Sequence, residues 1–189
     1  ICIFNNKSFN ALASMIACLK IGAIYTNIDV TSPWQRINKM LQTCHPKVIL
    51  NDDIKSTAID EIKKENNIPL INIQSNEFNE IIAKEAPENL KLSKLITGDQ
   101  PAYLMFTSGS TGFPKGAVMT HSNVINFISW GKETFSVTEK DIFTNVNPIY
   151  FDNSVFDFYI SLFSGASIAP VTSDITKDTQ LVIKTINSI

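Results

Sequence analysis

A run of small, hydroxyl-bearing residues that ends in a lysine offers the clearest chemistry in this sequence. Positions 107–116 hold four hydroxyl residues, three glycines and one lysine directly after an apolar segment. The candidate binding residues are Thr107, Ser108, Gly109, Ser110, Thr111, Gly112 and Lys115. Glycines let backbone N–H groups approach an anion, hydroxyls donate further hydrogen bonds, and the ammonium adds a positive charge. These residue types in this order predict a phosphate-binding loop.

The common nucleotide-binding loops have a different pattern. A Walker loop needs GxxxxGK followed by Ser or Thr, whereas Lys115 follows Pro114 and precedes Gly116. The GxGxxG pattern of dinucleotide-binding folds is also missing from the sequence. A Ser/Gly surface hairpin without a ligand is the alternative interpretation for a run of this composition.

The order of residues around the loop resembles the signature phosphate loop of the adenylate-forming superfamily. That superfamily comprises acyl-CoA synthetases, luciferases and the adenylation domains of non-ribosomal peptide synthetases. The matching stretch is 104–118, in which Phe106 stands where a Tyr is frequent. Residues 19–29 are similar to an upstream structural motif, and residues 151–154 to the FDxS motif of the amino-acid-activating branch. Trp130 and residues 151–159 resemble D-alanine:carrier-protein ligases more than typical peptide synthetase modules.

The resemblance implies that a substrate carboxylate attacks the α-phosphate of ATP, giving an acyl-adenylate and pyrophosphate. ATP with Mg²⁺ would be the cofactors, and residues 107–115 would neutralise the charge that builds on the leaving pyrophosphate. Transfer to a thiol would follow, either the phosphopantetheine of a carrier protein or coenzyme A. No catalytic residue and no metal ligand is expected within the chain, because the family's catalytic lysine and its adenine and ribose contacts would lie outside it.

Asp152 and Phe151 are the expected substrate-binding residues, carried over from the same resemblance. Asp152 would face the α-ammonium group of an amino acid. A buried carboxylate left unpaired disfavours an acid that lacks this cation, so the discrimination can be large. The alternative interpretation is that Asp152 only caps a helix over 154–162.

Three functions from different classes remain open. The first is an amino-acid-activating ligase that passes the acyl group to a carrier-protein thiol, and it depends on Asp152 in its FDxS context. The second is an acyl-CoA synthetase for a fatty or aryl acid, which would not need a carboxylate at that position. The third is a non-catalytic nucleotide-binding module.

Strand and helix patterns alternate along the chain and predict an α/β fold, three-layered, with mostly parallel sheets flanked by helices. Expected strands are 23–25, 48–50, 70–73, 102–106, 117–119, 142–146 and 167–171. Expected helices are 10–20, 33–41, 59–62, 78–82, 122–135 and 154–162. Asn10 and Ser32 are the expected N-caps, and Gly22 and Gly165 the expected helix stops.

A Lys- and Glu-rich segment predicts two subdomains, 1–83 and 101–189, joined by a connector at 84–100. The second would carry the phosphate loop. The chain begins in an apparent strand and stops in an apparent helix. With the resemblance, this suggests a fragment of the large N-terminal domain of an adenylate-forming enzyme, inactive by itself.

Composition excludes several other classes. With 44% hydrophobic and 18% charged residues among 189, the chain is typical of a folded domain. A net charge of −2 with scattered lysines argues against nucleic acid as a partner. No apolar run reaches the roughly 20 residues that span a bilayer, and no signal peptide opens the sequence, so we expect no membrane partner and a cytoplasmic location. The three cysteines predict buried free thiols, and the tryptophans and phenylalanines are expected in the core.

Overall fold

The computed structural model describes residues 1–29, 31–65, 68–92, 94–107 and 114–189. The first half is a parallel sheet with the strand order β2-β1-β3-β4. Its strands are β1 (Cys2–Phe4), β2 (Thr26–Asn27), β3 (Ile49–Asn51) and β4 (Leu70–Asn72). The helices between and after them are α1 (Phe9–Ile21), α2 (Trp34–Cys44), α3 (Thr57–Glu65) and α4 (Asn76–Lys84).

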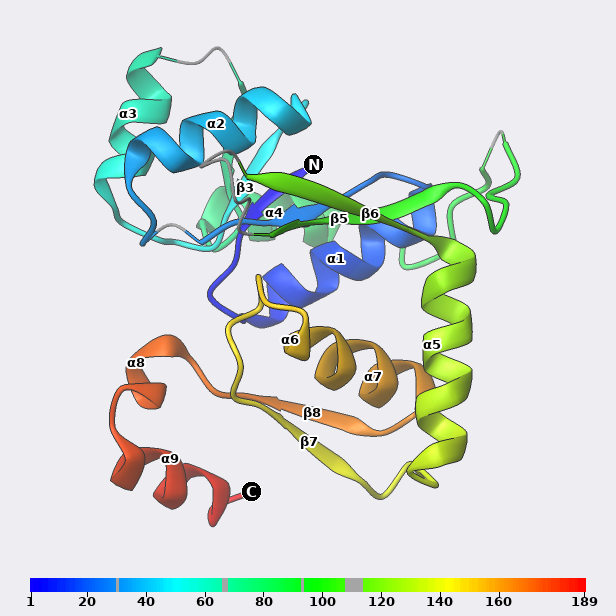
Figure 1. The fold of residues 1–189 in the computed structure, drawn as a ribbon. Helices are drawn as coiled ribbons and strands as arrows, with labels where there is room; N and C mark the ends of the chain where they lie inside the picture. The colour runs from blue at the N-terminus through cyan, green and yellow to red at the C-terminus, as the bar shows by residue number, and fades with distance from the viewer. Residues whose placement is uncertain (30, 66–67, 93, 108–113) are drawn as a thin grey trace.

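Helices cover both faces of this sheet, which is why its central strand is apolar throughout. Cys2, Ile3 and Phe4 of β1 are all fully buried. Ile3 packs in one cluster with residues of α1, whereas its neighbours Cys2 and Phe4 pack in another with residues of α2 and α3. Successive side chains of a strand point to opposite faces, so α1 lies on one face and α2 and α3 lie on the other (Figure 1).

Both expected helix stops are confirmed, and both expected N-caps are wrong. Gly22 and Gly165 take left-handed conformations after their helices, with φ of 68° and 86°. Helix α1 is capped by Ser8 instead of Asn10, because the Ser8 hydroxyl accepts a hydrogen bond from the Ala11 N–H at 3.1 Å. At α2 the N-cap is Pro33, and the hydroxyl of Ser32 donates to Asp29 at 3.2 Å instead.

The second half combines an antiparallel ladder with a parallel pair of strands. The ladder consists of β5 (Pro101–Thr107) and β6 (Lys115–Thr120), and the pair of β7 (Ile142–Asn145) and β8 (Ser167–Pro170). The helices are α5 (His121–Thr134), α6 (Asn153–Val155), α7 (Ser161–Ser164), α8 (Ser173–Thr176) and α9 (Thr179–Ile186). The predicted helix at 154–162 is present, but a π-helical turn, η1 (Phe156–Ile160), lies between α6 and α7. Helix α5 runs beside this helical segment (Figure 1).

The two halves share one core. Strand β5 lies beside β2, and the Leu104 N–H donates to the Tyr25 carbonyl at 2.8 Å. A single buried cluster contains Leu12 and Met15 of α1 together with Tyr103 of β5 and Phe158 of η1. Residues 84–92 are exposed. The division of the chain at 84–100 therefore stays a prediction, and packing across it is extensive.

The cysteines are free thiols. Cys2 and Cys18 are buried as predicted, whereas Cys44 is half-buried. Burial raises the pKa of each of these thiols. Across the described ranges, no helix is both long enough and apolar enough to cross a bilayer.

Candidate functional site

A cleft of about 620 Å³ lies between the β5–β6 ladder, helix α5 and the helical segment α6–η1. This volume is in the range of small-molecule sites. Strand β5 contributes Tyr103, Met105 and Thr107, which alternate along the strand and so share one face. Asp152 and Phe156 lie on the opposite wall. The cleft therefore contains residues from both motifs that the sequence singled out.

Aromatic and aliphatic side chains form most of the cleft wall. Phe127 of α5 packs against Trp130 and Phe156, with ring centroids 5.5 and 6.4 Å apart. Trp130 lines the cleft and is 50% exposed, so the expectation that it lies in the core is wrong. An apolar wall with a few polar groups is typical of a pocket that binds an organic molecule by its hydrocarbon part and orients it by its polar part.

The described ends of the predicted phosphate loop lie together at one end of the ladder. Thr107 pairs with Lys115 in the strand register, and the Thr107 hydroxyl donates to the Lys115 carbonyl at 3.3 Å. The Lys115 side chain is exposed, and its ammonium has no hydrogen-bond or salt-bridge partner among the described residues. The five other loop candidates, Ser108, Gly109, Ser110, Thr111 and Gly112, lie outside the described residues.

Asp152 caps a helix, as one of its two interpretations predicted, and it also lines the cleft, where it is exposed and not buried as the other interpretation expected. One carboxylate oxygen accepts the Asn153 N–H at 2.9 Å at the start of α6. The other has no hydrogen-bond partner within the ranges that the structure describes. Phe151 is 55% exposed, packs on Tyr150 with ring centroids 5.0 Å apart, and is not among the residues that line the cleft. The structure thus brings Asp152, but not Phe151, to the cleft.

Tyr103 lines the cleft but belongs to neither of the two sequence motifs. Burial, and then the charge of Asp152, raise the pKa of Tyr103 to about 12. The same negative charge favours a cation in the cleft. The sequence could have indicated Tyr103 and Met105. They lie four and two residues before Thr107, and alternate residues of a strand share one face.

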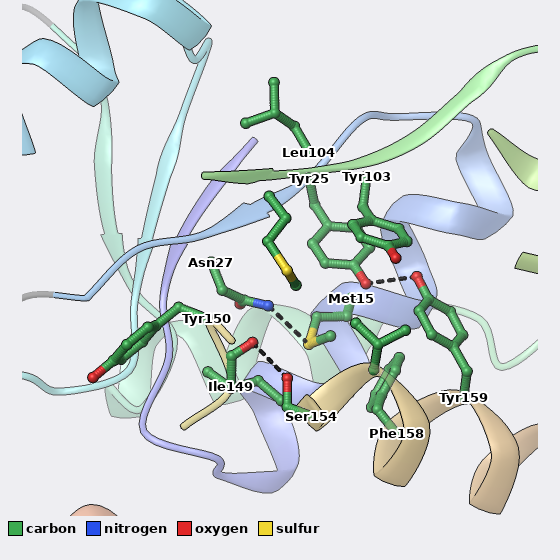
Figure 2. A pocket seen from close by; sticks show the side chains of 12 residues that line it. Met15, Tyr25, Asn27, Tyr103, Leu104, Ile149, Tyr150, Ser154, Phe158 and Tyr159 are labelled. Carbon is green, nitrogen blue, oxygen red and sulfur yellow. Dashed lines mark hydrogen bonds between the residues drawn. The ribbon is translucent and has the colours of Figure 1, made fainter. Parts of the chain in front are cut away.

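A second, much smaller cavity lies below β5 and is too small for a substrate (Figure 2). Its volume of about 10 Å³ is comparable to one water molecule. The hydroxyl groups of Tyr25 and Tyr159 point toward one another beside it and are 2.7 Å apart (Figure 2). This cavity belongs to the packed core, and the larger cleft is the candidate site.

The chain matches the AMP-binding enzyme family over residues 1–189. It belongs to this family. AMP-binding relatives include a dimodular nonribosomal peptide synthase from Bacillus subtilis (strain 168), 33% identical over 183 residues, which cover 96% of the chain and 7% of the synthase. Another is a D-alanine--D-alanyl carrier protein ligase from Listeria monocytogenes, 29% identical over 181 residues, which cover 93% of the chain and 33% of the ligase.

Solved structures share the fold of this chain. The N-terminal domain of FACL13 from Mycobacterium tuberculosis matches with a TM-score of 0.81 and 22% identity, covering 97% of this chain and 46% of that one. The N-terminal subdomain of NpsA from Klebsiella oxytoca matches with a TM-score of 0.77 and 21% identity, covering 99% and 43%. The predicted family and the predicted α/β fold of an adenylate-forming N-terminal domain are confirmed. The chain spans about one third of the length of the ligases it matches.

Proposed function

We propose that this chain forms part of an ATP-dependent ligase that activates an amino acid as its aminoacyl-adenylate and passes it to a carrier-protein thiol. One observation carries the proposal: Thr107, at the start of the phosphate loop, and Asp152 line the same cleft. An amino acid presents a carboxylate and an ammonium group on one carbon. A site that activates it must hold the ammonium group and bring the phosphates of ATP to the carboxylate, and Asp152 and Thr107 would serve these two roles from opposite walls.

The substrate would lie with its ammonium group at the free oxygen of Asp152 and its side chain against the apolar wall near Phe127 and Phe156. Its carboxylate would then point toward Thr107 and Lys115. A carboxylate oxygen attacks the α-phosphorus of ATP, the bond to the β-phosphate oxygen breaks, and pyrophosphate leaves with its electron pair. The Lys115 ammonium and the loop hydroxyls would stabilise the charge that develops on pyrophosphate.

Mg²⁺ would enter with the nucleotide in this proposal. Within the described residues, no group of three or more His, Cys, Asp or Glu side chains could hold a metal ion. The Thr107 hydroxyl is an oxygen donor of the kind that Mg²⁺ accepts, and the phosphates of the nucleotide would provide the other ligands. The ion would neutralise phosphate charge.

The acceptor in this proposal is a thiol that displaces AMP from the acyl-adenylate and forms a thioester. Support for a carrier protein comes from the AMP-binding relatives, among which are ligases named for a D-alanyl carrier protein. Because the chain spans only about a third of those ligases, we expect the 189 residues alone to bind ATP weakly and to be inactive. A micromolar Kd for ATP by isothermal calorimetry would contradict this expectation.

ATP–pyrophosphate exchange by the full-length enzyme tests the proposal directly. Exchange that depends on an amino acid, with fatty and aryl acids inactive, is the expected result. Exchange with fatty or aryl acids alone would instead indicate an acyl-CoA synthetase. Tight ATP binding without exchange for any acid would indicate a non-catalytic nucleotide-binding module.

A further inference from the structure

Lys7 is a buried lysine that connects the first sheet to strands β7 and β8. It follows β1, is only 7% exposed, and adopts a left-handed backbone conformation with φ of 64°. Its N–H donates to the side-chain oxygen of Asn5 at 2.7 Å, which supports this turn. Left-handed geometry is uncommon for a residue with a side chain, so the surrounding contacts must maintain it.

The ammonium group of Lys7 donates to three backbone carbonyls at the carboxyl ends of β7 and β8. The distances are 2.6 Å to Asn145, 3.2 Å to Val146 and 2.7 Å to Val171. An ammonium has three N–H donors, so these contacts use all of them. Hydrogen bonds from a charged donor are stronger than those between neutral groups, and a buried lysine without them would be strongly unfavourable.

The segment that starts at these carbonyls leads directly to Asp152. Further along it, burial and then the nearby charge of Asp29, which follows β2 of the first sheet, raise the pKa of the Tyr150 phenol. At its far end, the Ser154 hydroxyl bonds the carbonyls of Ile149 at 3.0 Å and Phe151 at 2.6 Å, the first of which is drawn in Figure 2. Hydrogen bonds therefore hold residues 146–152 toward both ends, and Lys7 holds the end where the segment leaves β7.

We propose that Lys7 is a positioning residue for amino-acid recognition: by fixing the start of segment 146–152, it holds Asp152 at the cleft. The inference rests on the proposed function, because it assigns Asp152 to the substrate ammonium. Lys7 itself is not a cleft residue. It acts through the backbone, and a small displacement of a recognition group can reduce activity by a large factor.

The groups around Lys7 are compatible with a positively charged side chain at this position. Burial lowers the pKa of Lys7 to about 8, and the charge of Asp157 partly opposes that shift. Burial raises the pKa of Asp157, while a hydrogen bond from the Asn145 side chain at 3.1 Å and the charge of Lys7 lower it. At neutral pH the Lys7 side chain is therefore mainly an ammonium with three donors. The Asn145 residue links the two, because its carbonyl accepts from Lys7 and its amide donates to Asp157.

The test is a comparison of KM values in ATP–pyrophosphate exchange by the full-length enzyme. Lys7→Met keeps the length of the side chain and removes its charge and donors, and Lys7→Arg restores a cation with donors. Lys20→Met, which changes an exposed lysine on α1, is the matched control. We expect Lys7→Met to raise the KM for the amino acid about tenfold and the KM for ATP less than twofold, and Lys7→Arg to recover part of the loss. Lys20→Met should leave both KM values unchanged.

Amide hydrogen exchange on the same variants separates positioning from a general loss of structure. Lys7→Met should accelerate exchange in residues 146–152 and leave helix α5 protected. Equal increases in both KM values, or faster exchange throughout the chain, would overturn the inference, and so would an unchanged amino-acid KM. If Lys7→Met does not fold, Lys7→Gln and Lys7→Arg carry the test, with the KM for the amino acid expected to rise in the order wild type, Arg, Gln. If the wild-type enzyme shows no ATP–pyrophosphate exchange that depends on an amino acid, the proposed function fails. The protection of residues 146–152 from amide hydrogen exchange still decides whether Lys7 fixes this segment.

Discussion

Tyr103 and Asp152 face the same cleft, and the charge of Asp152 adds to burial in raising the pKa of the Tyr103 phenol. That charge disfavours anions and favours an ammonium group. The cleft is thus polarised, with Asp152 on one wall and the lysine of the phosphate loop at the end of the ladder.

Lys115→Gln should reduce the rate of adenylation while leaving the fold intact. The side chain is exposed, so its loss removes charge at the phosphates and little packing. Removing one donor that stabilises transition-state charge typically costs about 10²–10³ in kcat. The measurement is exchange kinetics at saturating ATP, with the exposed Lys140→Gln as the control. A kcat within threefold of wild type would show that Lys115 does not act on the phosphates.

Gly131→Ala should destabilise the protein, although alanine normally favours a helix. A Cβ at Gly131 of α5 would lie 2.9 Å from Cγ1 of Ile160, which is fully buried in η1. Overpacking of this kind costs about 1–3 kcal/mol, which exceeds the roughly 0.5–1 kcal/mol gained in helix propensity. Urea unfolding measures the change, and Ser129→Ala on the exposed face of α5 should stay within about 0.5 kcal/mol of wild type. Adding Ile160→Val should relieve part of the effect, and additive losses would contradict this account.

Tyr25 and Tyr159 should show strong coupling in a double-mutant cycle. Their hydroxyl groups form a buried hydrogen bond of 2.7 Å, so either single change to Phe leaves one buried hydroxyl without its partner. Each single change should cost about 1–3 kcal/mol in the free energy of unfolding, and the double change less than the sum. Strictly additive values would mean that each hydroxyl finds another partner.

The free energy of unfolding should depend on pH through Lys7. Burial lowers the pKa of Lys7 from 10.5 to about 8 in the folded chain. Between these pH values the unfolded chain holds more protons than the folded one, so the contribution of this group to the free energy of unfolding rises with pH. Below about pH 8 both states are protonated and the contribution is constant. We therefore expect the free energy of unfolding of wild type minus that of Lys7→Met, measured by urea unfolding, to rise from pH 8 toward 10.5. A constant or falling value would contradict the lowered pKa of Lys7.

Much of this architecture follows from patterns within short windows of sequence. Alternating strand and helix segments predicted the parallel sheet and its covering helices, and Gly22 and Gly165 ended helices as expected because only a left-handed residue fits there. The N-caps were predicted wrongly because tertiary contacts decide between nearby candidates. The Ser8 hydroxyl is held against Asp52, a residue after β3, and this contact is not visible in the local sequence.

Sequence motifs predicted some of the residues that line the cleft, and their chemical roles stay predictions. Asp152 and Thr107 were found from their motifs, and Tyr103 and Met105 follow from the alternation of β5 once Thr107 is placed in the cleft. Lys7 could not be found in this way. Its three acceptors are backbone carbonyls far along the chain, and carbonyls carry no signature in the amino-acid sequence.

The central claim is that Asp152 recognises a substrate ammonium group, and the most direct test is a cycle of two enzymes and two substrates. Wild type and Asp152→Asn are compared in ATP–pyrophosphate exchange with the preferred amino acid and with the same acid lacking its amino group, and Asp60→Asn is the surface control. Wild type should have a higher kcat/KM for the amino acid than for the acid without an amino group. Asp152→Asn should lower the kcat/KM for the amino acid about 10- to 100-fold, as expected for a charge-assisted hydrogen bond of about 1.5–3 kcal/mol. The kcat/KM for the acid without an amino group should change little. An equal loss for both substrates, or none for either, would contradict the account.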